Sequence, residues 1–129
     1  MLRAGITGQG ETMVTEENTA KTVGSGELDV FATPAMIALM EKTAYKSVAD
    51  SLEEGMGSVG TLMNVKHLAA TPMGMKVTCQ TELKEVDGRR LVFHVEARDE
   101  AGIIGEGIHE RFIVENEKFQ NKADSKKQR

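Results

Sequence analysis

The spacing of apolar residues predicts one long amphipathic helix, from Pro34 to about Glu53. At 100° per residue, most apolar side chains of this segment fall on one side and most charged and hydroxyl side chains on the other. The apolar side comprises Ile37, Ala38, Met40, Ala44, Tyr45, Val48, Ala49 and Leu52, whereas Leu39 falls on the polar side. Thr33 is expected to cap the helix, with Pro34 in its first position. Gly55 and Gly57 are expected to end it.

After the helix the hydrophobic pattern has a period of two, which predicts β-strands. With a short candidate before the helix, the predicted strands cover residues 11–15, 61–69, 75–86, 90–98 and 103–115. The Asp87-Gly88 pair is typical of a β-hairpin. Gly105 and Gly107 lie inside the last strand, where glycine indicates a bulge or a close approach of two backbones. The order of elements predicts an α+β fold, with an antiparallel sheet of about five strands packed on one helix.

The length of 129 residues fits a single domain covering the whole chain. The Gly-rich residues 1–10 and the polar residues 118–129 are expected to form loosely ordered tails. The Gly-Ser-Gly sequence at 24–26 indicates a turn or a flexible stretch. In the two strands of the predicted hairpin, the side chains expected to point inward are Val77, Cys79, Thr81, Leu83, Leu91, Phe93, Val95 and Ala97.

Charge and cysteine content narrow the function classes. The net charge of −4 and the pI of about 5.4 do not indicate a surface that binds nucleic acid. The single Cys79 excludes an intramolecular disulfide and fits a reducing compartment. Residues 1–10 contain no apolar run typical of a signal peptide, and no stretch approaches the ~20 apolar residues that span a membrane. We therefore expect a cytoplasmic protein that binds neither nucleic acid nor membrane.

Two polar residues stand among apolar neighbours. Glu41 falls near the middle of the apolar arc of the helix, where a carboxylate needs a compensating partner. It either lies at a loosely covered edge, bonded to a backbone N–H, or takes part in a site. His67 shares a strand face with Met63 and Val65 and, taken alone, is more simply explained as a buried structural histidine. If the two faces meet, however, they bring a carboxylate and an imidazole together, and such a pair can act in acid–base catalysis.

Thr33 has two possible uses. Its hydroxyl can cap the helix, which alone explains the residue, but a helix N-terminus also stabilises a developing negative charge such as a thioester oxyanion. His94 is expected to be exposed, and His109 to face a space near the glycines of the last strand that has room for a ligand. Cys79 is expected to be a buried apolar residue rather than a nucleophile. The sequence has no GxSxG, Walker loop, dinucleotide fingerprint or zinc-ligand spacing.

Several short segments share their order and spacing with a known family. They are VFATPAM (30–36), LME (39–41), GSVGT (57–61), HLAATPMG (67–74), VDGRRL (86–91) and GIHER (107–111). Over roughly residues 11–120 the chain resembles the fluoroacetyl-CoA thioesterase-like family. The resemblance implies a hotdog fold, a homodimer or higher oligomer with sites between subunits, and hydrolysis of acyl-CoA thioesters to free acid and coenzyme A. No cofactor is expected, because coenzyme A is part of the substrate.

The resemblance also implies roles for individual residues. The implied catalytic residues are Thr33, Glu41 and His67, and the implied substrate contacts are Gly60 and Arg111. The family's fluoroacetyl-selective enzyme closes its pocket with an aromatic lid upstream of the helix. Residues 24–27 occupy that region here without an aromatic, and Phe31, a further candidate contact, is the only aromatic nearby. We therefore expect short acyl chains to be accepted without a strong preference for fluoroacetyl. An enoyl-CoA hydratase and a non-catalytic acyl-CoA or small-ligand binding module are the alternatives.

The spacing of Thr33 and Glu41 adds a geometric expectation. On a straight helix, residues eight apart lie about 12 Å apart along the axis and are turned by about 80°. A glutamate cannot close that gap to the first turn of its own helix. We therefore expect each site to draw on both subunits of a two-fold dimer, with Thr33 of one chain facing Glu41 and His67 of the other.

Overall fold

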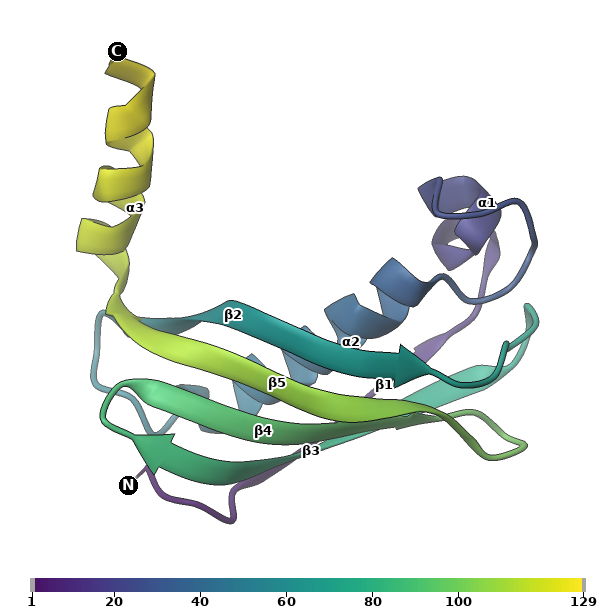
Figure 1. Cartoon of the computed structure of the whole chain (residues 1–129), viewed down its shortest axis with the longest axis horizontal. Coiled ribbons are helices and arrows are strands. Elements are labelled where there is room, and N and C mark those ends of the chain that lie inside the picture. The colour runs from purple at the N-terminus through teal and green to yellow at the C-terminus, as the bar shows by residue number, and fades with distance from the viewer. Residues whose placement is uncertain (1, 129) are drawn as a thin grey trace.

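The predicted sheet is present, and its five strands are antiparallel in the order β1-β3-β4-β5-β2. The computed structural model describes residues 2–128. Its strands are β1 (Thr7–Met13), β2 (Met56–His67), β3 (Lys76–Asp87), β4 (Arg90–Arg98) and β5 (Ile103–Glu115). Its helices are α1 (Ala20–Val23), α2 (Thr33–Ala49) and α3 (Asn116–Asp124), with short 3-10 turns at Glu16–Asn18 and Ser125–Gln128. The long helix α2 lies behind the sheet, which confirms the expected α+β fold (Figure 1).

The core forms between α2 and the inner faces of β3 and β4. All eight residues predicted to point inward from these strands are buried. The hairpin prediction is also confirmed, because Asp87 pairs with Arg90 and Gly88 has a φ of 62° between them. Glycine adopts this positive φ without the steric cost that a side chain would bring.

The buried face of α2 differs from the predicted one by a rotation about the helix axis. The buried residues are Met36, Leu39, Met40, Thr43, Ala44 and Val48, whereas Ala38, Tyr45 and Ala49 are exposed. The rotation follows from β1, which lies close against the side of the helix that the sequence assigned to solvent. A Cβ on Gly10 would contact Thr43 and Leu39, so the absence of a side chain there lets the helix pack against β1. The opposite flank of α2, with Ile37, Glu41 and Tyr45, is left partly open.

The expected helix bounds were also partly wrong. Thr33 is the first helical residue, Ala32 precedes it as the cap, and no side chain caps the helix. The Thr33 hydroxyl bonds to a strand side chain instead, as described below. The helix ends at Ala49 rather than near Glu53, and the chain turns into β2 at Gly55, which has a φ of 82°.

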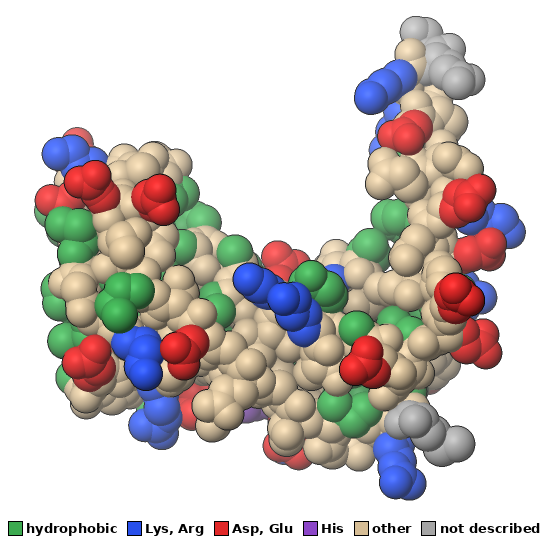
Figure 2. Space-filling model, turned by 180° about the vertical axis from the view of Figure 1, so that it is seen from behind, with side chains coloured by type: hydrophobic (Ala, Val, Ile, Leu, Met, Phe, Trp, Pro, Cys, Tyr) green, Lys and Arg blue, Asp and Glu red, His purple; other side chains and the backbone are tan. Residues whose placement is uncertain are grey.

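Both expected tails are structured within residues 2–128. Residues 7–10 belong to β1, where they pair with residues 79–82 of β3, so this strand starts earlier than predicted. Residues 116–128 form α3 and a 3-10 turn rather than a frayed end, although α3 buries none of its side chains. The α1 region and α3 rise at opposite ends of the sheet, both on the side of β2 (Figure 1). Seen from behind, they are two arms with a recess between them (Figure 2).

Two glycines of β5 allow close approaches to neighbouring elements. A Cβ on Gly107 would overlap the carbonyl oxygen of Asn64 and the Cα of Val65 in β2. A Cβ on Gly105 would overlap the end of the Met36 side chain, from the first turn of α2. The predicted close approach is therefore confirmed. Among residues 2–128, no helix is long and apolar enough to cross a membrane.

Gly107→Ala should lower the free energy of unfolding by roughly 1–3 kcal/mol, the usual cost of overpacking a filled site. The atoms that the new methyl group would overlap belong to the backbone of β2 and cannot move aside separately. Urea unfolding followed by circular dichroism measures the change. Gly26→Ala is the control, because it lies in an exposed loop where the one near atom is the Cβ of Ala20 at 3.3 Å. Equal losses in the two variants would contradict the argument.

Candidate active site

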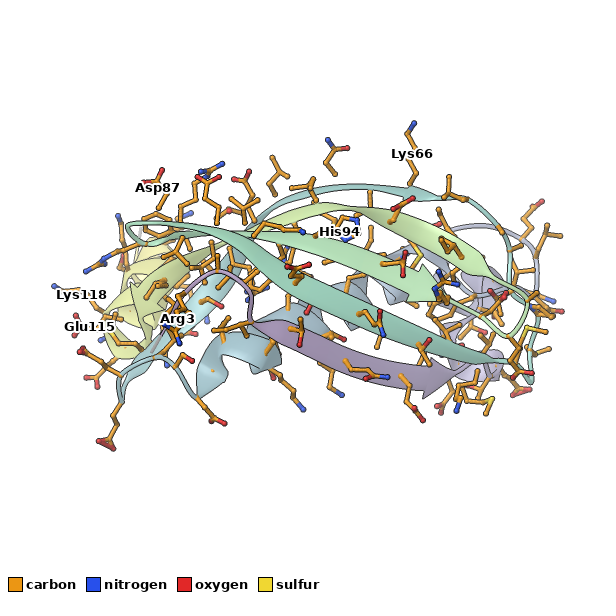
Figure 3. The ribbon with its side chains drawn as sticks, turned by 90° about the horizontal axis from the view of Figure 1, so that it is seen from below. Arg3, Lys66, Asp87, His94, Glu115 and Lys118 are labelled. Carbon is orange, nitrogen blue, oxygen red and sulfur yellow. The ribbon has the colours of Figure 1, made fainter. Side chains whose placement is uncertain are left out.

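Thr33 and His67 meet where α2 begins and β2 ends. Thr33 Oγ1 lies 2.7 Å from His67 Nδ1, within hydrogen-bonding distance. His67 pairs with Gly105 in the sheet, and the space above Gly105 receives Met36 from α2. The missing side chain at Gly105 thus lets the first turn of the helix come close to the end of β2. Lys66, one residue earlier, points away from the sheet (Figure 3), so the strand alternation turns His67 inward.

The His67 ring is partly buried, and its two nitrogens have different surroundings. Its Nε2 is buried and has no hydrogen-bond partner among the described residues. Burial lowers the pKa of His67 below its ordinary value, because a water-poor environment disfavours the imidazolium form. Near pH 7 the ring is therefore neutral. One nitrogen contacts Thr33, and the other is left without a partner within residues 2–128.

A hollow of about 290 Å³ opens beside this pair. Its lining comprises Ala20, Ser25, Val30, Phe31, Thr33, His67, Leu68, Ala69 and Ala70. Phe31 is buried, and its backbone N–H donates to the carbonyl of Thr71 at 2.8 Å, which ties the entry to α2 to the loop after β2. Phe31 is the one aromatic side chain among these lining residues. The hollow is therefore lined mainly by small and apolar groups.

Glu41, Gly60 and Arg111 form a second cluster further along α2. Arg111 Nη1 lies 3.7 Å from Glu41 Oε2, and Arg111 pairs with Gly60 across β5 and β2. A Cβ on Gly60 would overlap the Glu41 carboxylate, so only glycine leaves room for it. The Arg111 side chain is 8% exposed and that of Glu41 43%. Glu41 thus sits at the open flank of α2, which corrects its expected place near the middle of the buried arc.

Arg111 is held by a residue that the sequence did not single out. Its Nε donates to Ser58 Oγ and its Nη2 to the Ser58 carbonyl, both at 2.8 Å. Its guanidinium carbon also lies 5.7 Å from the centre of the Tyr45 ring. Ser58 lies in the first part of β2, before the residues that were predicted to form the strand. The hydrophobic pattern therefore did not indicate that its side chain points inward.

The six expected site residues therefore form two groups within one chain. Thr33 and His67 meet beside Phe31, and Glu41 meets Gly60 and Arg111. The expectation that Thr33 and His67 come from different chains was wrong, because they bond within one chain. The strand end that carries His67 and the helix start that carries Thr33 lie together on the sheet, an arrangement that the spacing along α2 could not reveal.

The other candidates have structural explanations. Cys79 is fully buried, and burial raises the pKa of its thiol to about 11, so it stays protonated at neutral pH. His94 is half-exposed on the outer face of the sheet (Figure 3), 3.5 Å from Glu106. His109 is buried and bonded on both sides, so the space expected beside it is filled.

The sheet packed around one long helix, with polar groups at the helix start and along its open flank, defines the class as a hotdog-fold thioesterase. The chain matches the fluoroacetyl-CoA-specific thioesterase family (FlK) over residues 14–117 and belongs to it. A fluoroacetyl-CoA thioesterase from Streptantibioticus cattleyicolor is 47% identical over 98 residues, which cover 76% of this chain and 70% of that protein.

Solved structures support the same assignment. The structure of the fluoroacetyl-CoA thioesterase FlK superimposes with a TM-score of 0.92, at 39% identity and 98% coverage of both chains. A Thermus thermophilus hypothetical protein of the thioesterase superfamily superimposes with a TM-score of 0.89, at 31% identity, covering 98% of this chain and 93% of that one. The expected family and fold are thus confirmed.

Proposed function

We propose that the protein hydrolyses short-chain acyl-CoA thioesters to the free acid and coenzyme A, in the cytoplasm. The observation that carries this proposal is the hydrogen bond between Thr33 and a neutral His67 at the edge of a small, mainly apolar hollow. The hollow fits an acyl group of a few carbons. The start of α2 supplies a positive end of the helix dipole, which favours the oxyanion that forms when a thioester carbonyl is attacked.

His67 acts as the general base. With the proton on Nε2, its Nδ1 accepts the hydroxyl proton of Thr33 and activates that oxygen, either for attack or for orienting a water molecule. The Nε2–H then needs an acceptor, because its desolvated position is costly without one. A carboxylate is the acceptor that best stabilises an imidazolium, and Glu41 is the one carboxylate among the six site residues. Within one chain, Glu41 faces Arg111 instead.

The missing carboxylate points to a homodimer in which two β2 strands meet. Beside β2 the open flank of α2 carries the apolar side chains of Ile37 and Tyr45 around Glu41, and Leu62 of the strand is 43% exposed. The other edge, at β1, is flanked by Lys42 and Lys46 of α2. An unpaired apolar edge invites association, whereas lysines oppose it. The two arms also leave a recess on the β2 side (Figures 1 and 2).

Antiparallel pairing of two β2 strands explains the two separate clusters. The end of one strand, with His67, then lies beside an earlier part of the other, where Gly60 is. Each site takes Thr33 and His67 from one subunit, and Glu41, Gly60 and Arg111 from its partner.

A panel of acyl-CoA substrates, including acetyl-, propionyl- and crotonyl-CoA, tests the activity by release of free thiol. Cys79 adds little background to a thiol reagent because it is buried and protonated. Release of coenzyme A is the expected result. Loss of enoyl absorbance without thiol release would indicate a hydratase, and binding without either change would indicate a non-catalytic binding module.

Glu41→Gln and His67→Ala should each lower kcat by about 100-fold or more while leaving the fold intact, because each removes a proton-transfer or orienting group. Steady-state thiol release measures kcat, and circular dichroism checks folding. His94→Ala is the matched control on the outer face and should keep its turnover. If Glu41→Gln or His67→Ala kept near wild-type kcat, that residue would have no catalytic role.

Mixing inactive variants tests the shared site. Thr33→Ala and Glu41→Gln chains should regain about a quarter of wild-type activity when mixed in equal amounts, since half the dimers are mixed and each mixed dimer has one intact site. Thr33→Ala with His67→Ala should regain none, because both groups belong to the same half-site. Sedimentation should show dimers at micromolar concentration. A monomer, or no recovery despite chain exchange, would disprove the shared site.

The acyl preference follows from the composition of the hollow. Residues 24–27 are exposed and contain no aromatic side chain, and Phe31 is buried in the wall. We expect kcat/KM for fluoroacetyl-CoA to exceed that for acetyl-CoA by no more than about 10-fold, a difference of roughly 1.4 kcal/mol. Kinetics with both substrates side by side measure the ratio. A far larger preference would show that the hollow discriminates without an aromatic cover.

A further inference from the structure

His109 lies buried beneath the Glu41–Arg111 cluster and is bonded at both ring nitrogens. It is 1% exposed on the inner face of β5, and its ring stacks on Phe93 with the ring centres 6.1 Å apart. Its Nδ1 lies 2.9 Å from the Leu62 carbonyl oxygen, and its Nε2 lies 3.1 Å from Arg111 Nη1. The sequence suggested a space for a ligand beside His109, and hydrogen-bonded groups of the protein fill that space instead.

The two partners determine where the imidazole carries its proton. A carbonyl oxygen can only accept, so Nδ1 must donate to Leu62. A guanidinium can only donate, so Nε2 must accept from Arg111. His109 is therefore neutral, with its hydrogen on Nδ1. Burial lowers its pKa, and the charge of Arg111 lowers it further, although the bond to Leu62 and the charge of Glu41 oppose this.

These bonds hold an irregular part of β2. Gly60 pairs with Arg111 and Leu62 with Glu110, so Thr61 is an extra residue between them, a β-bulge. His109 ties the backbone at Leu62, on one side of the bulge, and Arg111 ties it at Ser58, on the other. The segment between these two ties contains Gly60, whose backbone lies against the Glu41 carboxylate.

The same bonds orient Arg111. Its guanidinium has five N–H groups, of which one each on Nε, Nη1 and Nη2 are used by Ser58 and His109. The Nη1 atom that donates to His109 is also the one that lies 3.7 Å from Glu41. His109 is thus the neutral acceptor at the Nη1 edge of the guanidinium, whose opposite edge is held by Ser58.

We propose that His109 is a positioning residue for the thioesterase reaction. As a neutral side chain that accepts one hydrogen bond and donates another, it holds Arg111 and the Gly60–Leu62 bulge in place around Glu41. It touches neither substrate nor the reacting atoms, and it acts through Arg111 and Glu41. This inference rests on the proposed function, because Glu41 matters only if the site hydrolyses a thioester.

A pH dependence follows from this role. The charged groups that act on His109 are Arg111 from its own strand and Glu41 from α2, and Tyr45 of α2 lies against Arg111. Protonation places a hydrogen on Nε2, directed at the guanidinium, so Arg111 must leave its position. Acid therefore inactivates the enzyme through protonation of His109 in addition to protonation of the catalytic groups themselves. At low pH the logarithm of kcat/KM should rise with pH at a slope that is larger by one than it would be if His109 stayed neutral.

Three variants separate the two bonds of His109. In His109→Gln the amide oxygen can reach the Nε2 position and accept from Arg111, and in His109→Asn the amide nitrogen can take the Nδ1 position and donate to Leu62. His109→Phe keeps the ring and its contact with Phe93 but makes neither bond. His94→Gln is the control, since it changes a histidine on the outer face.

We expect kcat to fall by about 10- to 100-fold in His109→Phe and His109→Asn, the scale of a small misplacement in an active site. His109→Gln should stay within about 3-fold of wild type, and its acid slope should be smaller than that of wild type by one. KM should change far less than kcat. The control His94→Gln should match wild type in kcat, KM and acid slope. Thermal unfolding identifies any variant that does not fold. If His109→Phe does not fold, the proposal is tested by comparing His109→Gln with His109→Asn.

Two results would overturn the proposal. The first is wild-type kcat in folded His109→Phe or His109→Asn, and the second is an acid slope in His109→Gln that equals that of wild type. An inactive wild-type enzyme would instead disprove the proposed function. Nitrogen-15 NMR would then still test the hydrogen-bond arrangement of His109. This arrangement requires a neutral ring with its hydrogen on Nδ1, and a hydrogen on Nε2 at pH 7 would refute it.

Discussion

The close contact between the first turn of α2 and the end of the sheet governs the rest of this structure. Met36 occupies the space above Gly105, where any side chain on β5 would push the helix away. That contact lets Thr33 reach His67, which pairs with Gly105 from the neighbouring strand. A well-packed core tolerates little change in volume, so the position of the helix and the geometry of the Thr33–His67 pair are determined together.

The remainder of α2 follows from how far the sheet curves around it. Gly8 and Gly10 let β1 lie against one flank, which buries Leu39 and Thr43. A single sheet of five strands cannot cover both flanks equally, so the side near β2 remains open. The polar groups Glu41 and Arg111 lie on that open side. The fold thus places the apolar core and the polar cluster on different faces of one helix, and the cluster lies on the side where the proposed second subunit would pack.

Buried polar groups on the inner face of β5 also have a consistent physical explanation. His109 and Arg111 occupy positions where apolar side chains would be expected, and a buried guanidinium is costly unless its N–H groups are bonded. Ser58 and His109 supply three of these bonds, and the carbonyls of Ser58 and Leu62 are bonded in turn. A network of this kind is rigid because each member depends on the next, and so it holds Arg111 in a fixed position beside Glu41.

The sequence by itself determined the periodic features of this protein. The period of two placed all eight inward residues of β3 and β4 correctly, and the segments shared with the thioesterase family indicated the fold and the class. Local patterns report which side chains alternate, and they do so independently of distant contacts. Only the tertiary structure decided which flank of α2 is buried, that the Thr33 hydroxyl bonds to His67 instead of capping its helix, and that Glu41 belongs to a different cluster. These outcomes depend on where β1 and β5 approach the helix, and therefore on contacts between residues far apart in the chain, which no local pattern contains.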